Sequence, residues 1–175
     1  MISKKELKER AERQSFYPWP SPIGELILVC SSLGLTEIVF ADAESDWYSR
    51  LSTFADEDQR PLNSVIKALR SYFYNKTDKG LRRLVIDIHG TPFQRAVWEQ
   101  VLAIPYGTTK TYGNIAEAVG YPLAARAVGR AVGSNPIPIV IPCHRVIGTN
   151  GRLVGFSSGI DKKRTLLERE GLSFS

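Results

Sequence analysis

The chain has 175 residues, of which 43% are hydrophobic and 23% charged, a mixture typical of one or two globular domains with buried cores. These figures exclude collagen-like, coiled-coil and intrinsically disordered proteins. No apolar run approaches the roughly 20 residues that a membrane helix needs, and the first residues lack the apolar core of a signal peptide. We therefore expect a cytoplasmic protein with no membrane partner.

The net charge of +5 is unevenly distributed along the chain. Residues 1–109 carry equal numbers of basic and acidic side chains, whereas residues 110–175 carry nine basic against four acidic ones. A basic third beside a neutral remainder predicts a polyanionic partner for the C-terminal part. Solvated surface charge explains the same count equally well, so charge alone does not decide between the two.

The two cysteines, Cys30 and Cys143, lie far apart and form no disulfide framework. Together with His89 and His144 they are the only soft metal ligands, and their spacing is not that of a zinc site, so no metal is expected. Cys30 ends an apolar run with no base nearby, which predicts a buried structural thiol. His89 is expected to be a surface or boundary residue.

The first half of the chain predicts an α+β arrangement. Residues 4–14, rich in charge and in helix formers, predict a surface helix or frayed arm. Three β-like runs, at residues 15–19, 25–30 and 36–40, are separated by proline and glycine and predict an antiparallel meander. Residues 41–58 are acidic and weakly patterned.

A helix opened by Pro61 is expected after these runs. Residues 84–88 predict a further strand, and Gly90 marks a break. We place the domain boundary there, between an N-terminal α+β domain over residues 1–89 and a C-terminal domain over residues 90–175. One face of the predicted helix is apolar and consists of Leu62, Val65, Ile66, Leu69, Tyr72 and Phe73.

Helix signals dominate residues 91–133. Thr91-Pro92-Phe93-Gln94 fits a capping box with proline at the first helical position. A second helix is expected over residues 111–119, followed by a turn at Gly120-Tyr121-Pro122 and a third helix over about residues 123–132. Helix, glycine turn and helix at this spacing predict a helix-turn-helix, although many helical corners share the pattern.

The third of these helices contains the repeat Arg126-Ala127-Val128-Gly129 and Arg130-Ala131-Val132-Gly133. Glycine inside a helix costs about 1 kcal/mol relative to alanine, so the small residues need a compensation. Tight packing on another helix is one explanation. Close approach to a nucleic acid, with Arg126 and Arg130 one turn apart on one face, is the other. Taken alone, the repeat favours packing.

The segment from Ser134 to Val146 contains three prolines, which forbid a continuous helix. Its apolar content predicts a buried, extended stem that delivers Cys143 and His144 at its end. A free thiol has a pKa of about 8.5, and the neighbouring imidazole and the Arg145 guanidinium are the local groups that favour the thiolate. A buried structural thiol is the alternative for Cys143.

The imidazole of His144 has two further requirements. Adjacent residues on an extended stem point in opposite directions, so a direct contact between Cys143 and His144 is not guaranteed and a bridging water could be needed. An acid is wanted to orient the ring. Glu170, late in a helix predicted over residues 161–170, is the candidate.

The hexapeptide Ile141-Pro142-Cys143-His144-Arg145-Val146 resembles the active-site motif of the O6-alkylguanine-DNA alkyltransferases. The resemblance covers about residues 91–171, and more loosely the N-terminal part. It also rests on collinear segments, namely Pro105-Tyr106-Gly107, Thr111-Tyr112, Ala125-Arg126-Ala127-Val128-Gly129, Ser134-Asn135-Pro136 and Leu166-Leu167 before Glu170-Gly171.

The resemblance implies an α+β protein, with a small N-terminal antiparallel sheet of ribonuclease H-like fold and a mainly helical C-terminal domain bearing a winged helix-turn-helix. It implies a single-turnover DNA repair enzyme that transfers a methyl or alkyl group from O6-alkylguanine to its own cysteine, with O4-alkylthymine as an alternative substrate. No cofactor is expected. The expected partner is double-stranded DNA carrying alkylated bases, bound by a monomer.

The resemblance also implies the catalytic residues. Cys143 is the acceptor, His144 is its base acting through water, and Glu170 orients the imidazole. Asn135 braces the active-site turn. Tyr112 hydrogen-bonds the flipped guanine and assists its departure as a neutral base.

Further residues are implied in substrate and DNA binding. Arg126 enters the duplex and occupies the space of the flipped nucleotide. Main-chain groups at Cys143, Val146 and Ser158 read the edge of the base. Ser157 stands in the loop that lines the alkyl pocket, where relatives often carry tyrosine.

Two other functions are compatible with parts of the pattern. A non-catalytic protein that binds alkylated DNA would lack the acceptor cysteine, and the presence of Cys143 argues against it. A transcription regulator using the helix-turn-helix would prefer a DNA sequence and ignore damage.

Overall fold

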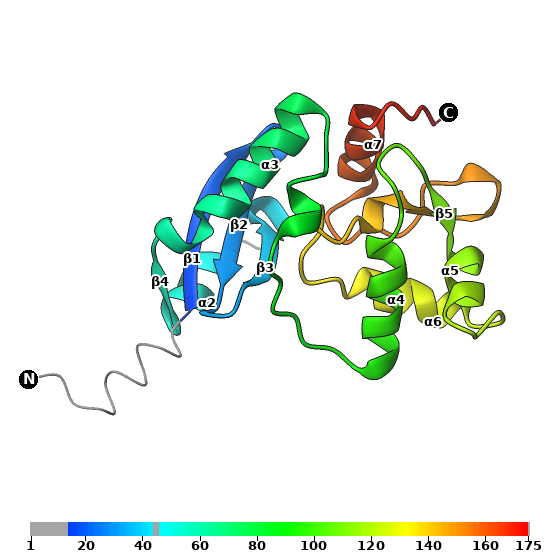
Figure 1. The fold of residues 1–175 in the computed structure, drawn as a ribbon, viewed down its shortest axis with the longest axis horizontal. Helices are drawn as coiled ribbons and strands as arrows, with labels where there is room; N and C mark the ends of the chain where they lie inside the picture. The colour runs from blue at the N-terminus through cyan, green and yellow to red at the C-terminus, as the bar shows by residue number, and fades with distance from the viewer. Residues whose placement is uncertain (1–13, 44–45, 175) are drawn as a thin grey trace, which may run out of the picture.

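The computed structural model describes residues 14–43 and 46–174 (Figure 1). Residues 4–13 of the predicted arm lie outside the described residues. A sheet with its helices stands at one end of the molecule, and a mainly helical part stands at the other (Figure 1). Within the described residues, no helix is long and apolar enough to cross a membrane.

The N-terminal sheet has the strand order β3-β2-β1-β4. Strands β1 (Gln14–Ser21), β2 (Gly24–Cys30) and β3 (Leu35–Phe40) are antiparallel, so the predicted meander is confirmed. Strand β4 (Ala55–Glu57) adds to β1 in parallel, which the weakly patterned residues 41–58 did not predict. The same stretch contains helix α2 (Trp47–Ser52).

Strand β2 is buried on both of its faces. Leu26 and Leu28 belong to the main core, whereas Ile27 and Val29 belong to a smaller cluster on the other face. Because both faces are covered, this strand is a continuous apolar run and does not alternate between apolar and polar residues.

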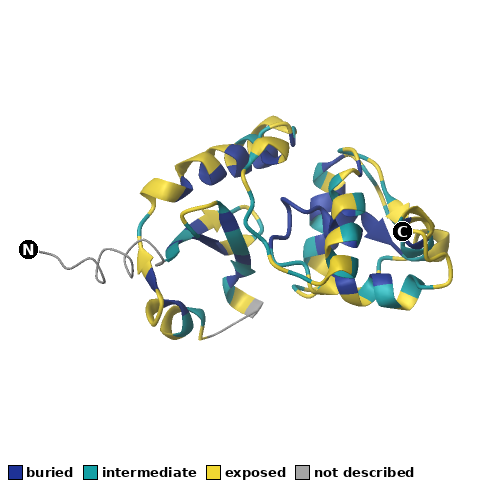
Figure 2. Ribbon diagram, turned by 60° about the horizontal axis from the view of Figure 1, so that its bottom comes forward, coloured by how far each residue is buried: buried dark blue, intermediate teal, exposed yellow. Residues whose placement is uncertain are grey.

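Helix α3 (Asn63–Asn75) covers the main-core side of the sheet, and the predicted apolar face is confirmed, since all six of its residues are buried. Figure 2 shows α3 turning these buried residues toward the strands. Pro61 does not open α3 itself. It lies in a 3-10 turn, Arg60–Leu62, that precedes the helix.

The strand predicted over residues 84–88 is wrong. These residues form one isolated bridge, between Leu35 and Ile86, and Val85 is exposed. Two hydrogen bonds make this bridge, from Leu35 N to Val85 O at 3.0 Å and from Asp87 N to Leu35 O at 2.8 Å. Farther along the same edge of β3, Ile38 N donates to Pro136 O at 2.9 Å instead. Pro136 of the C-terminal part therefore occupies the edge of β3 along which a longer strand at residues 84–88 would have to pair.

The C-terminal part begins with helix α4 (Pro92–Leu102), whose predicted capping box is present. Helix α5 (Tyr112–Ala118) is capped in the same way by Thr111 and Asn114. Helix α6 (Ala125–Gly133) packs against α5, and the two form the helix-turn-helix. It begins two residues later than predicted, because Leu123 lies in the turn and is fully exposed.

Strands β5 (Lys110–Thr111) and β6 (Val146–Ile147) form a short parallel ladder, and helix α7 (Ile160–Arg169) ends the C-terminal part. One continuous core joins both parts, from the sheet and α3 to Trp98 and Ile141. The domain division between residues 89 and 90 stays a prediction, and if it holds, the two domains share this core.

Candidate active site

A tightly bonded turn after α6 positions the predicted nucleophile. The Asn135 side chain spans this turn, with Nδ2 donating to Ile141 O at 2.8 Å and Oδ1 accepting from Ile137 N at 3.0 Å. Between them, the buried Ile139 has a φ of 75°, a conformation that β-branched residues rarely adopt. The turn is therefore held in a strained shape by its hydrogen bonds and its burial.

Cys143 follows in a 3-10 turn, Cys143–Arg145, and is only 6% exposed. Burial raises the pKa of its thiol above the ordinary value of a free cysteine. The Asn135 side chain, the charge of Lys163 and hydrogen bonds from the backbone at Cys143 and His144 act in the opposite direction but do not outweigh burial. The resting group is therefore a neutral thiol, which needs a base before it can attack.

His144 is fully buried and supplies such a base. Its Nε2 lies 2.8 Å from Glu170 Oε1, an acceptor, so the ring proton belongs on Nε2 and Nδ1 is left as an acceptor. Among the described residues Nδ1 has no hydrogen-bond partner, although it is buried. Burial lowers the pKa of His144 below 6.5, with the charges of Arg145 and Lys163 adding to the effect. The imidazole is therefore neutral at neutral pH.

Glu170 lies directly after α7 and gathers donors from several elements. Arg145 binds it through both Nε and Nη2 at 2.9 Å, and Gly107 N donates to it at 3.1 Å. Burial alone would raise the pKa of this carboxyl group, but the hydrogen bonds and charges of His144 and Arg145 hold it at about 2. The carboxylate is therefore ionised across the physiological range and can fix the imidazole.

The expectation that Arg145 favours the Cys143 thiolate is wrong. Its guanidinium is 1% exposed and, besides Glu170, donates to Asp78 Oδ2 at 3.1 Å and to Ile104 O at 2.8 Å. Its N–H groups donate to the carboxylates of Glu170 and Asp78 and to a main-chain carbonyl, so its positive charge is paired with these carboxylates and is not directed at the thiol.

Lys163 is a candidate site residue that the sequence patterns did not single out. It is fully buried on α7, and its Nζ donates to Val146 O at 2.6 Å and to Val154 O at 2.7 Å. Burial lowers its pKa to about 8, so most of its charge is retained at neutral pH, next to Cys143. A signal existed, because Lys163 shares one helical face with Leu166, Leu167 and Glu170.

An open groove of about 590 Å³ lies between α5, α6 and the loop that follows β6. Tyr112 stands at its inner side, and its hydroxyl donates to Val154 O at 3.1 Å. Burial raises the pKa of Tyr112, and Cys143, once ionised, adds to the effect. The groove is lined by Tyr112, Gly113, Ala125, Arg126, Gly129, Arg130, Gly148, Thr149, Val154 and Gly155. Cys143 is close enough to Tyr112 to affect its pKa but does not line the groove itself.

The glycines of α6 are not required by packing inside the protein. A Cβ atom on Gly129 would meet Tyr112 at 3.9 Å, an ordinary contact, and one on Gly133 would meet nothing within 4 Å. Gly129 lines the groove, and Arg126 and Arg130 are exposed there. These observations favour close approach from outside over the packing explanation of the repeat.

Ser157 and Ser158 lie elsewhere. They line a hollow of about 280 Å³ against β3 and the segment Asn135–Pro138. Their loop is held by Phe156, whose ring packs edge-on against Phe40. The structure therefore brings Cys143, His144, Glu170, Asn135 and Tyr112 together, with Arg126 on the groove, but places the two serines in a separate hollow. The carbonyl of Val146 already accepts the Lys163 hydrogen bond.

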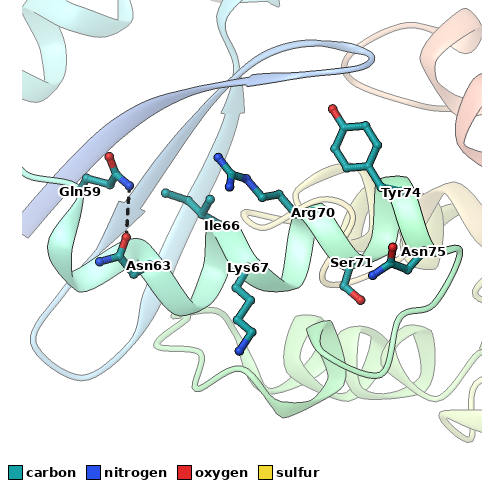
Figure 3. Close-up of a pocket in the computed structure, with 8 residues that line it drawn as sticks. All are labelled: Gln59, Asn63, Ile66, Lys67, Arg70, Ser71, Tyr74 and Asn75. Carbon is teal, nitrogen blue, oxygen red and sulfur yellow. Dashed lines mark hydrogen bonds between the residues drawn. The ribbon is translucent and has the colours of Figure 1, made fainter.

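Other surfaces contain none of the predicted site residues. A cavity of about 430 Å³ lies on the outer side of α3, and Gln59 donates to Asn63 across its end at 3.2 Å (Figure 3). Cys30 is buried, as expected, and His89 is exposed. Within residues 14–43 and 46–174, no three histidine, cysteine or acidic side chains are grouped so that they could hold a metal.

Comparison with known proteins places this arrangement in a family. Residues 13–88 match the ribonuclease-like domain of 6-O-methylguanine DNA methyltransferase, and residues 92–172 match the DNA-binding domain of the same family. The chain is 41% identical over 155 residues to the methylated-DNA–protein-cysteine methyltransferase of Mycobacterium bovis, covering 86% of this chain and 88% of that protein. The corresponding protein of Haemophilus influenzae is 35% identical over 156 residues, covering 89% and 86%.

Solved structures agree with this assignment. The crystal structure of Mycobacterium tuberculosis OGT in complex with DNA has a TM-score of 0.80 at 40% identity and covers 89% of this chain and 92% of that one. The O6-methylguanine-DNA methyltransferase of Pyrococcus kodakaraensis has a TM-score of 0.62 at 26% identity and covers 91% and 99%. The fold and site thus define a DNA alkyltransferase. The chain belongs to the 6-O-methylguanine DNA methyltransferase family.

Proposed function

We propose that Cys143 accepts the methyl or alkyl group of O6-alkylguanine in double-stranded DNA, in a single irreversible step that repairs the base directly. One observation carries the proposal. A buried neutral thiol follows a braced turn, beside a neutral imidazole whose Nδ1 is free and whose Nε2 is fixed by an ionised carboxylate. This is the arrangement of a nucleophile with its base and an orienting acid.

The residues account for each bond in the transfer. The thiol proton passes through one water to His144 Nδ1, and the charge of Lys163 stabilises the thiolate that forms. Sulfur attacks the alkyl carbon, a carbon–sulfur bond forms, and the bond from that carbon to guanine O6 breaks. The departing guanine takes a proton from the Tyr112 hydroxyl on the groove side and leaves as a neutral base. The proton held by His144 returns through water to the Tyr112 oxygen, so both side chains end neutral. No cofactor is needed, because only the substrate and the thiol exchange bonds.

DNA binding is assigned to the groove beside α6. Exposed arginines one turn apart neutralise phosphates, and small residues between them allow the backbone of α6 to approach the duplex. A base inside a duplex cannot reach a buried thiol that does not line the groove, so the damaged nucleotide must be extruded, with Arg126 filling its place. We propose that the protein does this as a monomer in the cytoplasm.

Incubation with duplex DNA containing O6-methylguanine tests the acceptor. We expect the intact mass to rise by one methyl group, located by peptide mapping on Cys143, with Cys30 unmodified. Cys143→Ala should show no gain in mass while retaining DNA binding. Binding of damaged duplex without any gain in the wild-type protein would instead support a non-catalytic binder. Preference for one DNA sequence with indifference to damage would support a transcription regulator.

Arg126→Ala tests extrusion. We expect this variant to lose at least tenfold in the transfer rate on duplex DNA and to react normally with the free modified base, because the free base needs no extrusion. Equal losses on both substrates would contradict the role of Arg126.

A further inference from the structure

The carboxylate of Glu170 receives a hydrogen bond from the N-terminal part of the protein. Tyr72 lies on α3, in the part that carries the sheet, and is 2% exposed. Its hydroxyl donates to Glu170 Oε1 at 2.8 Å and lies 3.4 Å from His144 Nε2. Its ring also packs edge-on against the imidazole, with centroids 6.4 Å apart. A residue far from the C-terminal motifs therefore contacts the predicted base and its acid.

One oxygen atom of Glu170 is shared by three donors. Oε1 accepts from Tyr72, from His144 Nε2 and from Arg145 Nη2, whereas Oε2 accepts from Arg145 Nε and Gly107 N. Each donor to a carboxylate oxygen withdraws part of the charge available to the others. The strength of the bond from His144 therefore depends on whether the Tyr72 hydroxyl is present.

We propose that Tyr72 is a positioning residue that tunes the hydrogen bond between Glu170 and His144, so that the N-terminal part completes the active site. The inference rests on the proposed transfer to Cys143, because it concerns the base of that reaction. The groups that face His144 are Glu170, Arg145, Lys163 and Tyr72, beside the adjacent Cys143.

Removal of the hydroxyl should have a defined sign. In Tyr72→Phe, Oε1 keeps only the donors from His144 and Arg145. The negative charge on Oε1 therefore interacts more strongly with the imidazole of His144. The protonated imidazole is then better stabilised and its pKa rises. Because only the neutral ring can accept the thiol proton, the acid limb of the rate profile should move to higher pH.

The experiment compares the wild-type protein, Tyr72→Phe and Tyr106→Phe. Tyr106 is the matched control, since it packs against Tyr72 but donates its hydroxyl to the main-chain Arg169 O at 3.1 Å and not to the carboxylate of Glu170. Methyl transfer from duplex DNA is followed by mass between about pH 5 and pH 9. For Tyr72→Phe we expect the acid limb to shift upward by about half a pH unit, so that the rate at a fixed pH on that limb falls about threefold.

Two further measurements separate the possible outcomes. Titration of the imidazoles by NMR follows His144 directly, with the exposed His89 as the internal reference, and urea unfolding checks that each variant folds. An upward shift of His144 in Tyr72→Phe alone supports the inference. Equal profiles and equal imidazole titrations in all three proteins overturn it. If the wild-type protein transfers no methyl group, the proposed function fails, and the NMR titration still decides the role of Tyr72.

Discussion

Two buried charges of opposite sign lie on the same side of the C-terminal segment, Lys163 on α7 and Glu170 directly after it, and each contacts different groups. Lys163 is tied to two main-chain carbonyls beside the thiol, whereas Glu170 is tied to the imidazole and to Arg145. Burying either charge is costly unless it is paired or hydrogen-bonded. Each is therefore kept for a specific partner, and substitution of either should have an effect that an exposed neighbour lacks.

Lys163→Met should slow the chemistry. The substitution removes the nearby cation that stabilises the Cys143 thiolate, so the pKa of the thiol should rise further. We expect transfer from duplex DNA at pH 7 to fall about tenfold or more, since one pKa unit corresponds to about 1.4 kcal/mol. Single-turnover mass spectrometry measures the rate. Lys162→Met is the matched control, because its amine pairs with Asp42 near the surface and should not affect the rate.

Glu170→Gln should lower the free energy of unfolding at neutral pH and make that free energy less dependent on pH in the acid range. The folded pKa of about 2 lies below the ordinary 4.5, so the carboxylate contributes stability above about pH 4.5 that is lost as the pH falls toward 2. We expect a loss of about 3 kcal/mol at pH 7, because the buried Arg145 is left with too little negative charge. Urea unfolding at several pH values measures both effects.

The exposed Glu168→Gln on the same helix removes an equal charge and serves as the control. An unchanged acid slope in Glu170→Gln, or an equal loss of stability in Glu168→Gln, would contradict the assigned role of the buried carboxylate.

At the scale of elements, a substitution in α6 should change the stability of the fold and the affinity for DNA in opposite directions. Gly129→Ala should raise the free energy of unfolding by about 0.5–1 kcal/mol, because alanine is the better helix former and the new Cβ has only ordinary contacts. The same Cβ stands in the groove, so DNA binding should weaken. Gly133→Ala, away from the groove-lining residues, tests the assignment as a matched control. Chemical unfolding measures the free energy of unfolding, and DNA titrations at equal salt concentration measure the affinity. Tighter DNA binding by Gly129→Ala would exclude close approach of the duplex at this position.

Local signals predicted the elements that depend on neighbours in sequence. The predicted capping box at Thr91 is present because all the atoms that make it lie within four residues, and the helix expected from residue 111 is capped in the same local way by Thr111. The strand over residues 84–88 failed for the opposite reason. An apolar run becomes a strand only where a partner edge is free, and the edge of β3 is partly used by Pro136.

The site shows the same division between local and distant information. The order Cys143, His144 and Glu170 could be read from motifs, whereas the burial of Lys163 depends on carbonyls of β6 and a later loop. Tyr72 was correctly expected on a buried face. Its hydroxyl partner lies 98 residues farther along the chain, and nothing in the local pattern of α3 identifies such a pair.

At the scale of the whole molecule, the two parts should unfold together. Their core is continuous, and buried pairs such as Arg145 with Asp78 join them. We expect a single transition in calorimetry, with equal calorimetric and van't Hoff enthalpies. Fluorescence of single-tryptophan variants retaining Trp19 or Trp98 should give coincident curves. Two separate transitions would show that the predicted domains are energetically independent.

The Glu170 carboxylate is bonded by side chains from both halves of the chain, and this limits how relatives can exchange those halves. Tyr72 and Asp78 come from the first half, and Arg145, His144 and Glu170 come from the second. A chimaera joining halves of two relatives would leave a buried ion without a matching donor or acceptor unless these side chains travelled together. The two halves are therefore not freely interchangeable modules, and functional recombinants between relatives should keep these five side chains together.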